Sequence, residues 1–292
     1  MNDKDFRKMI LDLQVNEITG REIYLRLSKN IKDLHNKALI LEIADEELVH
    51  YNIYKRYTAE DVEPDKKKII FYTMLSKIFG YIFTIRLLER EEDRSLEILL
   101  NPEIADSVID TKDIREQEEE HEERLISMLD EEKVSYISSI ILGLNDALVE
   151  ITGSLAGFTF AMQNTRIIAL SGLITGIAAS LSMAFSQYLA EKSAGKHNYI
   201  KASLYTGITY FITVLLLVFP FLIFPDNMYG TALALTLFVV IIVIFIFTFY
   251  ISIVKKVNFR QRFIEMLSIS MGVTVFSFLL GIVAKKLLGI DI

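Results

Sequence analysis

The pattern of apolar and polar positions changes near residue 135. Before it, apolar residues recur at intervals of three and four between charged ones, which is the spacing of amphipathic helices. The charged segment around Pro64 and the pair Asn101-Pro102 interrupt this spacing. The pattern predicts helices over about 3–30, 34–58, 67–100 (with Gly80 as a candidate interruption) and 111–132. Four such helices in succession predict a four-helix bundle.

Beyond residue 135 the chain is almost continuously apolar. Five runs each reach the roughly 20 residues that a helix needs to cross a bilayer. They lie at about 136–162, 167–189, 203–224, 229–254 and 263–288. The sequence therefore predicts an all-α protein in which a bundle domain, residues 1–134, precedes a five-span transmembrane domain, residues 135–292.

Charge is divided as unevenly as hydropathy. Residues 1–134 hold 32 of the 38 Asp and Glu and 21 of the 31 Lys and Arg, a net of −11, whereas residues 135–292 hold 6 and 10, a net of +4. The loops after the second and fourth spans are basic. The loops after the first and third contain a single basic residue between them, Arg166. Basic loops stay on the cytoplasmic side. The amino terminus lacks a secretory signal, so we expect a cytoplasmic bundle, with the carboxyl terminus on the opposite side, although Lys285 and Lys286 oppose this orientation.

The stretch Ile69–Leu88 is apolar enough to suggest a sixth span. Lys77 and Arg86 lie inside it, and each would cost about 3 kcal/mol near the centre of a bilayer. A bundle helix is therefore the favoured interpretation. An amphipathic segment resting on the membrane surface is the alternative.

Composition narrows the ligands that the bundle can bind. The chain has no cysteine, so disulfides and thiolate metal sites are excluded, and carboxylate, imidazole and thioether groups remain. The net charge of −7, without a basic cluster, argues against nucleic acid and is suited to concentrating cations. These ligands favour iron or manganese over structural zinc.

A candidate dinuclear metal site can be assembled from the four bundle helices. Such a site takes one Glu from each of two helices and a Glu-x-x-His pair from each of the other two. Spacing of three places both members of a pair on one helix face. The candidate ligands are Glu17 in the first helix, Glu47 and His50 in the second, Glu89 and Glu92 in the third, and Glu118 and His121 in the fourth.

Two ambiguities remain within this set. Glu46 also lies on the His50 side of its helix, four residues before it, and competes with Glu47 as a ligand. Glu118 belongs to the run 116–123, which would ordinarily be a solvated face. His35 falls in the turn between the first two helices, where we expect a solvated histidine.

These residues resemble the ferritin-like superfamily, and rubrerythrin-like proteins in particular. Tyr24 follows Glu17 by seven residues, and the third helix carries Glu89-x-x-Glu92, both as in those proteins. The resemblance covers about residues 1–132. It implies a ferritin-like bundle with a di-iron site cycling between Fe²⁺ and Fe³⁺, with Mn²⁺ as the other candidate.

The first span contains two acidic residues, which are expensive in a membrane and functional by default. Asp146 and Glu150 are four apart on one helix face and can offer oxygen ligands to a divalent ion. In the alternative interpretation, residues 136–150 are partly interfacial and both acids are hydrated. Met183, near the middle of the second span, would by itself be packing filler.

The strings 143–157 and 178–193 closely resemble the vacuolar iron transporter family. The resemblance implies five spans, a homodimer, and exchange of a divalent metal for protons through Asp146 and Met183. The chain departs from plant-type members in carrying Thr175 where they place a glutamate. It also has only a short connection at about 190–202, where they insert a glutamate-rich domain. The fused arrangement resembles the membrane-bound ferritin type.

Two pairs of glycines, Gly153 with Gly157 and Gly172 with Gly176, permit close helix contacts either within a subunit or across a dimer. We expect an integral protein of a prokaryotic plasma membrane that exports Fe²⁺, or Mn²⁺, by proton antiport. The bundle would collect the metal. The alternatives are a membrane-anchored ferroxidase or peroxidase, and a bundle that senses metal and gates the spans.

Overall fold

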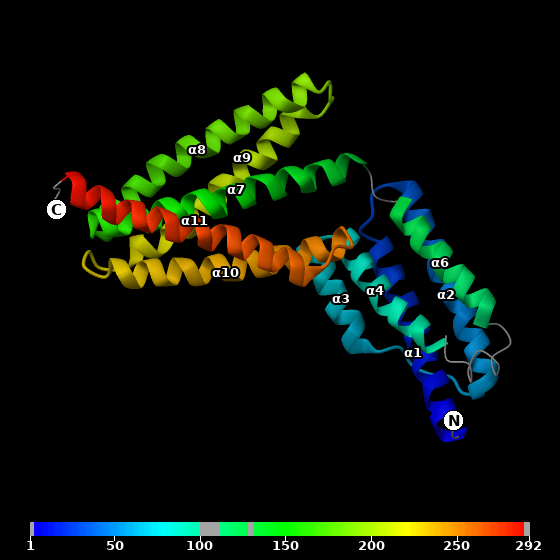
Figure 1. Ribbon diagram of the computed structural model, residues 1–292. Helices are drawn as coiled ribbons and strands as arrows, with labels where there is room; N and C mark the ends of the chain where they lie inside the picture. Colours follow the sequence, from blue (N-terminus) through cyan, green and yellow to red (C-terminus); the bar gives the residue numbers. More distant parts are fainter. Residues whose placement is uncertain (1–2, 100–110, 128–130, 289–292) are drawn as a thin grey trace. The chain divides into compact units, whose positions relative to one another are not determined.

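The computed structural model describes residues 3–99, 111–127 and 131–288, and every regular element in these ranges is an α-helix. The chain divides into two compact units, Met1–Leu129 and Asp130–Ile292. Figure 1 shows the helices of each unit. The all-α architecture agrees with the pattern of the sequence.

Unit 1 contains α1 (Asp3–Ser28), α2 (Leu34–Thr58), α3 (Lys66–Phe79), α4 (Tyr81–Leu99) and α6 (Thr111–Ser127). Aspartate side chains cap two of them: Asp33 accepts from the backbone of Asn36 at the start of α2, and Asp65 accepts from Lys67 and Lys68 at the start of α3.

The helix expected over 67–100 is two helices, α3 and α4, separated at Gly80. Gly80 has φ +85°, a conformation that disfavours residues with a side chain, and so it ends α3. The candidate interruption is therefore a real break. The predicted helix end at Asn101-Pro102 lies outside the described residues.

Two apolar clusters in unit 1 enclose a polar layer. One contains residues such as Tyr24 of α1, Ile43 of α2 and Leu125 of α6. The other contains Ile10 of α1, with Leu13, Tyr54 and Ile114. On α1, α2 and α6 the candidate ligands fall between the positions that enter these two clusters. Apolar packing above and below therefore shields most of the ligand layer from water.

Unit 2 contains α7 (Glu131–Met162), α8 (Thr165–Ser193), α9 (Tyr199–Ile223), α10 (Tyr229–Val254) and α11 (Phe259–Leu288). All five are long and apolar enough to cross a membrane, over spans that closely match the five predicted from the sequence. Many large apolar side chains are exposed on the outside of unit 2, as expected of surfaces that face lipid.

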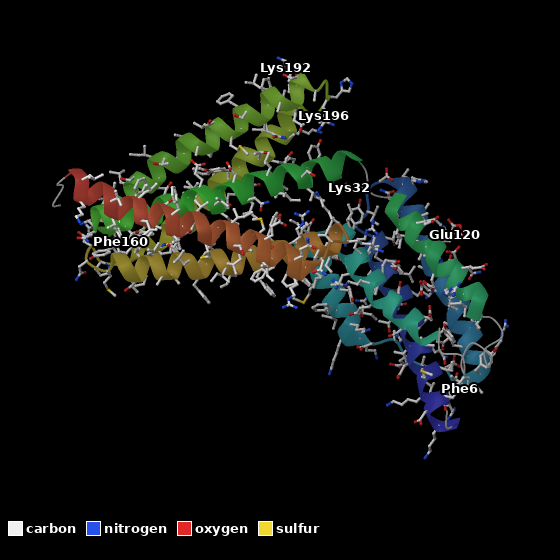
Figure 2. All side chains as sticks on the ribbon, viewed as in Figure 1. Phe6, Lys32, Glu120, Phe160, Lys192 and Lys196 are labelled. Atoms are coloured by element: carbon white, nitrogen blue, oxygen red, sulfur yellow. The ribbon has the colours of Figure 1, made fainter. Side chains whose placement is uncertain are left out.

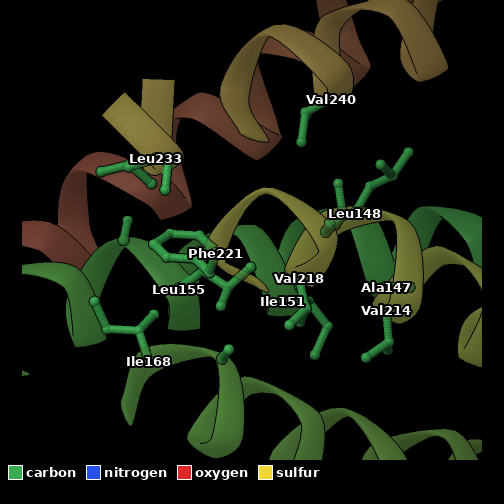
Figure 3. Packing of buried hydrophobic residues seen from close by; sticks show 14 of the residues in the cluster. Ala147, Leu148, Ile151, Leu155, Ile168, Val214, Val218, Phe221, Leu233 and Val240 are labelled. Carbon is green, nitrogen blue, oxygen red and sulfur yellow. The ribbon is translucent and has the colours of Figure 1, made fainter. Parts of the chain in front are cut away.

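Helix α7 is the centre of unit 2 and packs against α8, α9, α10 and α11. Its residues Ala147, Leu148, Ile151 and Leu155 meet Phe221 of α9 and its neighbours in a fully buried cluster (Figure 3). This packing fixes the helix that carries Asp146 and Glu150.

Close approach of α7 to its neighbours depends on glycine. A Cβ at Gly143 would overlap the backbone of Thr206 in α9, and one at Gly281 of α11 would lie 2.6 Å from the carbonyl oxygen of Gly157. The pairs whose role was open, Gly153 with Gly157 and Gly172 with Gly176, all make contacts inside the subunit. The first pair faces α11, and the second faces α9 and Leu155.

Candidate metal centre

The seven candidate ligands of unit 1 come from α1, α2, α4 and α6. Five of them are buried: Glu47, His50, Glu89, Glu118 and His121. Glu17 and Glu92 are partly buried. Charged residues are seldom buried without a partner, so a shared polar layer inside an apolar bundle needs a physical explanation.

Four of these residues offer ligand atoms that all lie within 4.8 Å of one another: Glu17, Glu47, His50 and Glu118. Nδ1 of His50 lies 2.8 Å from Oε1 of Glu118 and 3.5 Å from Oε2 of Glu17. These distances suit two ligands that face one ion from different sides.

Glu118 lies between the two histidines. Its other oxygen, Oε2, is 3.5 Å from Nδ1 of His121, and that nitrogen is 3.7 Å from Oε1 of Glu47. The two imidazole rings have centroids 5.8 Å apart. One carboxylate oxygen thus faces each histidine, an arrangement in which Glu118 could bridge two ions.

Glu89 and Glu92 bring α4 to the same layer. The hydroxyl of Tyr24 donates to Oε1 of Glu89. A Cβ placed on Gly20 would lie 3.4 Å from Oε1 of Glu92 and 3.5 Å from Oε2 of Glu47, so these two carboxylates converge on the same bare backbone position of α1.

Several atoms in this layer are buried without a hydrogen bond. Within the described ranges, Oε1 of Glu47, Nδ1 of His50, Oε2 of Glu92 and Nδ1 of His121 have no aligned partner. Nδ1 of His50 is near Glu118, but the two groups are not oriented as donor and acceptor. Leaving such atoms unsatisfied costs about 1–3 kcal/mol each. Bound cations would satisfy them, so the residues fit a metal centre.

The electrostatics of the layer support this fit. Burial raises the pKa of Glu47 and of Glu92, and neighbouring carboxylates raise both further. Burial also raises the pKa of Glu89, to about 7. Burial opposes the ionised form of Glu118 as well, but His121 and His50 outweigh it and lower that pKa to about 2. Five carboxyl groups in one layer cannot all ionise without cations, and two divalent ions would supply four positive charges.

Other residues hold the histidines in place. Burial lowers the pKa of His50, but the carboxylates of Glu118 and Glu17 outweigh it and raise the value to about 11.

Nε2 of His50 lies 2.8 Å from the side-chain oxygen of Gln117. A metal-binding imidazole commonly uses its second nitrogen in this way. Sequence reasoning missed Gln117, because nothing in the spacing separates it from the charged residues beside it.

The structure also distinguishes Glu46 from Glu47. Oε2 of Glu46 lies 2.7 Å from Nε2 of His121, the nitrogen that faces away from the cluster. Arg124 holds Glu46 from the other side through two contacts of 3.1 Å. Glu47 lies inside the layer, and Glu46 positions a histidine from outside it.

The glutamate run of α6 divides in the same way. Glu118 is buried, whereas Glu116, Glu120 and Glu123 are exposed; Figure 2 labels Glu120 on α6. These three glutamates thus lie on a solvated face, and Glu118 lies on the opposite side of the helix. His35 is exposed.

A cavity of about 220 Å³ reaches the centre from the side of α1 and α4. An ion pair between Lys68 and Glu91, at 3.0 Å, forms part of its wall. Its lining residues are Asn16, Thr19, Gly20, Lys68, Leu88, Glu91 and Glu92. The cavity gives small solutes a route to Glu92.

In unit 2, Asp146 and Glu150 lie on α7, and the hydroxyl of Tyr210 in α9 donates to Oε2 of Glu150 at 2.6 Å. Asp146 is half-buried and Glu150 is exposed. Met183 of α8 packs against the apolar core. Tyr210 was missed, although a hydroxyl in the middle of an apolar span is a signal that sequence reasoning could have used.

Comparison with protein families supports the membrane part of this picture. Five apolar helices define an integral membrane protein. A model described as the VIT family matches residues 137–199, which include Asp146, Glu150, Thr175 and Met183. The match supports a membrane domain of the vacuolar iron transporter kind and a role in moving iron or manganese across a bilayer. No curated protein and no solved structure matches the chain.

Proposed function

We propose that this protein exports a divalent metal, Fe²⁺ or Mn²⁺, from the cytoplasm in exchange for protons. One observation carries the proposal: the chain that matches the VIT family along α7 and α8 also holds a buried, unsatisfied cluster of carboxylates and histidines. The cluster collects the metal, and the membrane helices move it.

The energetics favour coupling to protons. Moving a divalent cation out of an inside-negative cell costs about 4.6 kcal/mol per 100 mV, at about 2.3 kcal/mol for each charge. An uncoupled pore would therefore let metal leak inward. Asp146 and Glu150 can each hold either a metal or a proton, because a carboxylate that binds metal must first lose its proton. Proton entry through this pair can drive metal export.

In unit 1 we propose a ferritin-like bundle whose seven ligands hold two metal ions. Glu17, Glu47 and His50 would hold one, Glu89, Glu92 and His121 the other, and Glu118 would bridge them. With iron bound, such a centre supplies one-electron chemistry between Fe²⁺ and Fe³⁺. From the resemblance to vacuolar iron transporters we also propose that the protein forms a homodimer.

A second function, ferroxidase or peroxidase activity with the spans as anchor, is favoured by the cavity beside Glu92. That cavity would admit a small oxidant to the centre. Oxygen consumption on adding Fe²⁺ to the purified full chain tests this function. Oxygen consumption by a protein that moves no metal under any gradient would favour the enzyme, whereas binding without turnover would favour a collector or sensor.

Transport is tested in liposomes that contain a pH indicator and a metal-sensitive dye. Under an imposed proton gradient, we expect Fe²⁺ and Mn²⁺ to move against the proton flux in wild type and not in Asp146→Ala. Asp226→Ala is the matched control, because it removes an acidic residue from the connection between α9 and α10, outside the spans. Absence of metal movement in wild type under any gradient would refute the proposal.

A further inference from the structure

Helix α3 carries an exposed apolar stripe that the metal centre does not use. Ile70, Phe71, Met74 and Ile78 are each 52 to 70% exposed. At 100° per residue they lie on one side of the helix. The opposite side holds Ile69 and Tyr72, which are almost fully buried in the bundle core. The helix is therefore anchored to unit 1 by one face and presents the other to its surroundings.

The same side of α3 is positively charged. Lys66, Lys67 and Lys77 are exposed there, and the sequence Lys66–Phe79 contains four lysines and no acidic residue. Lys66 also contacts Glu63 at 2.8 Å, but an exposed pair of this kind contributes little. The remainder of residues 1–134 is strongly acidic, so α3 is a cationic, apolar element on an anionic domain.

We propose that this stripe docks onto the anionic lipid surface of the membrane that the chain itself spans. A helix with large apolar residues on one face and lysines beside them is the type that lies in a bilayer interface, with its apolar side chains among the acyl chains. The lysines add attraction to anionic headgroups. The first candidate span begins at Tyr136 of the same chain, so contact between α3 and the bilayer would be an intramolecular event that needs no separate encounter.

The charges disfavour a second copy of the chain as the occupant. If two α3 stripes faced each other in parallel, Lys66 and Lys67 would meet their equivalents. In the antiparallel arrangement they would meet Lys77. Every pairing therefore brings like charges together at an apolar contact, whereas an anionic bilayer neutralises them.

A fluorescent label tests the docking in the full-length protein. The chain has no cysteine, so Met74→Cys gives a single site for an environment-sensitive nitrobenzoxadiazole label. Asn52→Cys, at an exposed position of α2, is the control site. In vesicles that contain phosphatidylglycerol, we expect lipid-borne doxyl groups to quench the label at position 74 and leave the label at position 52 nearly unquenched.

Charge reversal separates docking from simple proximity. Each lysine near an anionic surface contributes roughly fivefold to binding, so the loss of three lysines in K66E/K67E/K77E should alone lower the docked-to-undocked ratio by on the order of 100-fold, and the added negative charges should lower it further. The matched variant K8E/K29E/K32E makes the same charge change at exposed positions elsewhere on unit 1 and should leave quenching unchanged. Circular dichroism establishes that both variants are folded.

Three results would overturn the proposal. The labels at positions 74 and 52 could be quenched equally. Quenching at position 74 could be the same in phosphatidylcholine alone and insensitive to charge reversal. Finally, Met74→Cys could form disulfides between copies in high yield while its label escapes lipid quenching, in which case a second copy covers the stripe.

Discussion

Replacing Glu118 by glutamine tests the metal centre most directly, because the exchange preserves shape and removes one charge. Glu118 is buried, and its two oxygens lie 2.8 Å from His50 and 3.5 Å from His121. Its equivalent on the solvated side of α6 is Glu120, which is exposed. E118Q and E120Q therefore make the same chemical change on opposite faces of one helix.

The expected magnitudes differ widely. Removing one partner from a buried charged pair costs about 3 kcal/mol or more, which corresponds to a loss of metal affinity on the order of 100-fold. An exposed charge usually changes free energies by less than about 0.5 kcal/mol, or roughly twofold. A bridging role for Glu118 also requires that both ions be affected, so E118Q should lose stoichiometry as well as affinity.

The assay is equilibrium dialysis of the full-length protein in detergent against Mn²⁺ and Co²⁺, with bound metal measured by mass spectrometry. Wild type and E120Q should bind two ions per chain, and E118Q should bind fewer and more weakly. Equal binding by all three proteins would refute the assignment of the buried layer as the metal centre. Equal losses in E118Q and E120Q would indicate a diffuse electrostatic effect of the acidic domain.

Three further predictions concern stability. Metal that binds only the folded bundle at 100 times its Kd should stabilise it by about 2.7 kcal/mol, so chelation should lower the thermal midpoint of unit 1; an unchanged midpoint would contradict metal binding there. Because the pKa of Glu89 is raised from 4.5 to about 7, the folded metal-free bundle binds a proton that the unfolded chain releases, and its stability should fall as pH rises through this window. Thermal unfolding by circular dichroism at stepped pH measures this slope, and bound metal should remove it. Gly143→Ala should destabilise unit 2 by about 1–3 kcal/mol, because its Cβ overlaps Thr206. Gly272→Ala, where a Cβ meets nothing within 4 Å, should not, and denaturant unfolding compares the two variants.

The spacing of apolar residues along the chain was enough to predict an all-α protein and its five spans. Helix periodicity and bilayer thickness are local constraints, so they are written in consecutive residues. The break at Gly80 was foreseen as a candidate for the same reason. Whether the helix ends at Gly80 depends on the backbone conformation of that residue, which only the structure provides.

The set of candidate ligands could also be proposed from sequence, because Glu-x-x-His places two side chains on one helix face. Sequence could not decide between Glu46 and Glu47, or distinguish Glu118 from the other glutamates of its run. Those choices depend on how each helix is rotated about its axis within the bundle, which is set by the apolar clusters on both sides of the polar layer. Contacts such as Gln117 with His50 and Tyr210 with Glu150 join residues 60 or more positions apart. They exist only because tertiary packing brings separate helices together, and no local pattern records them.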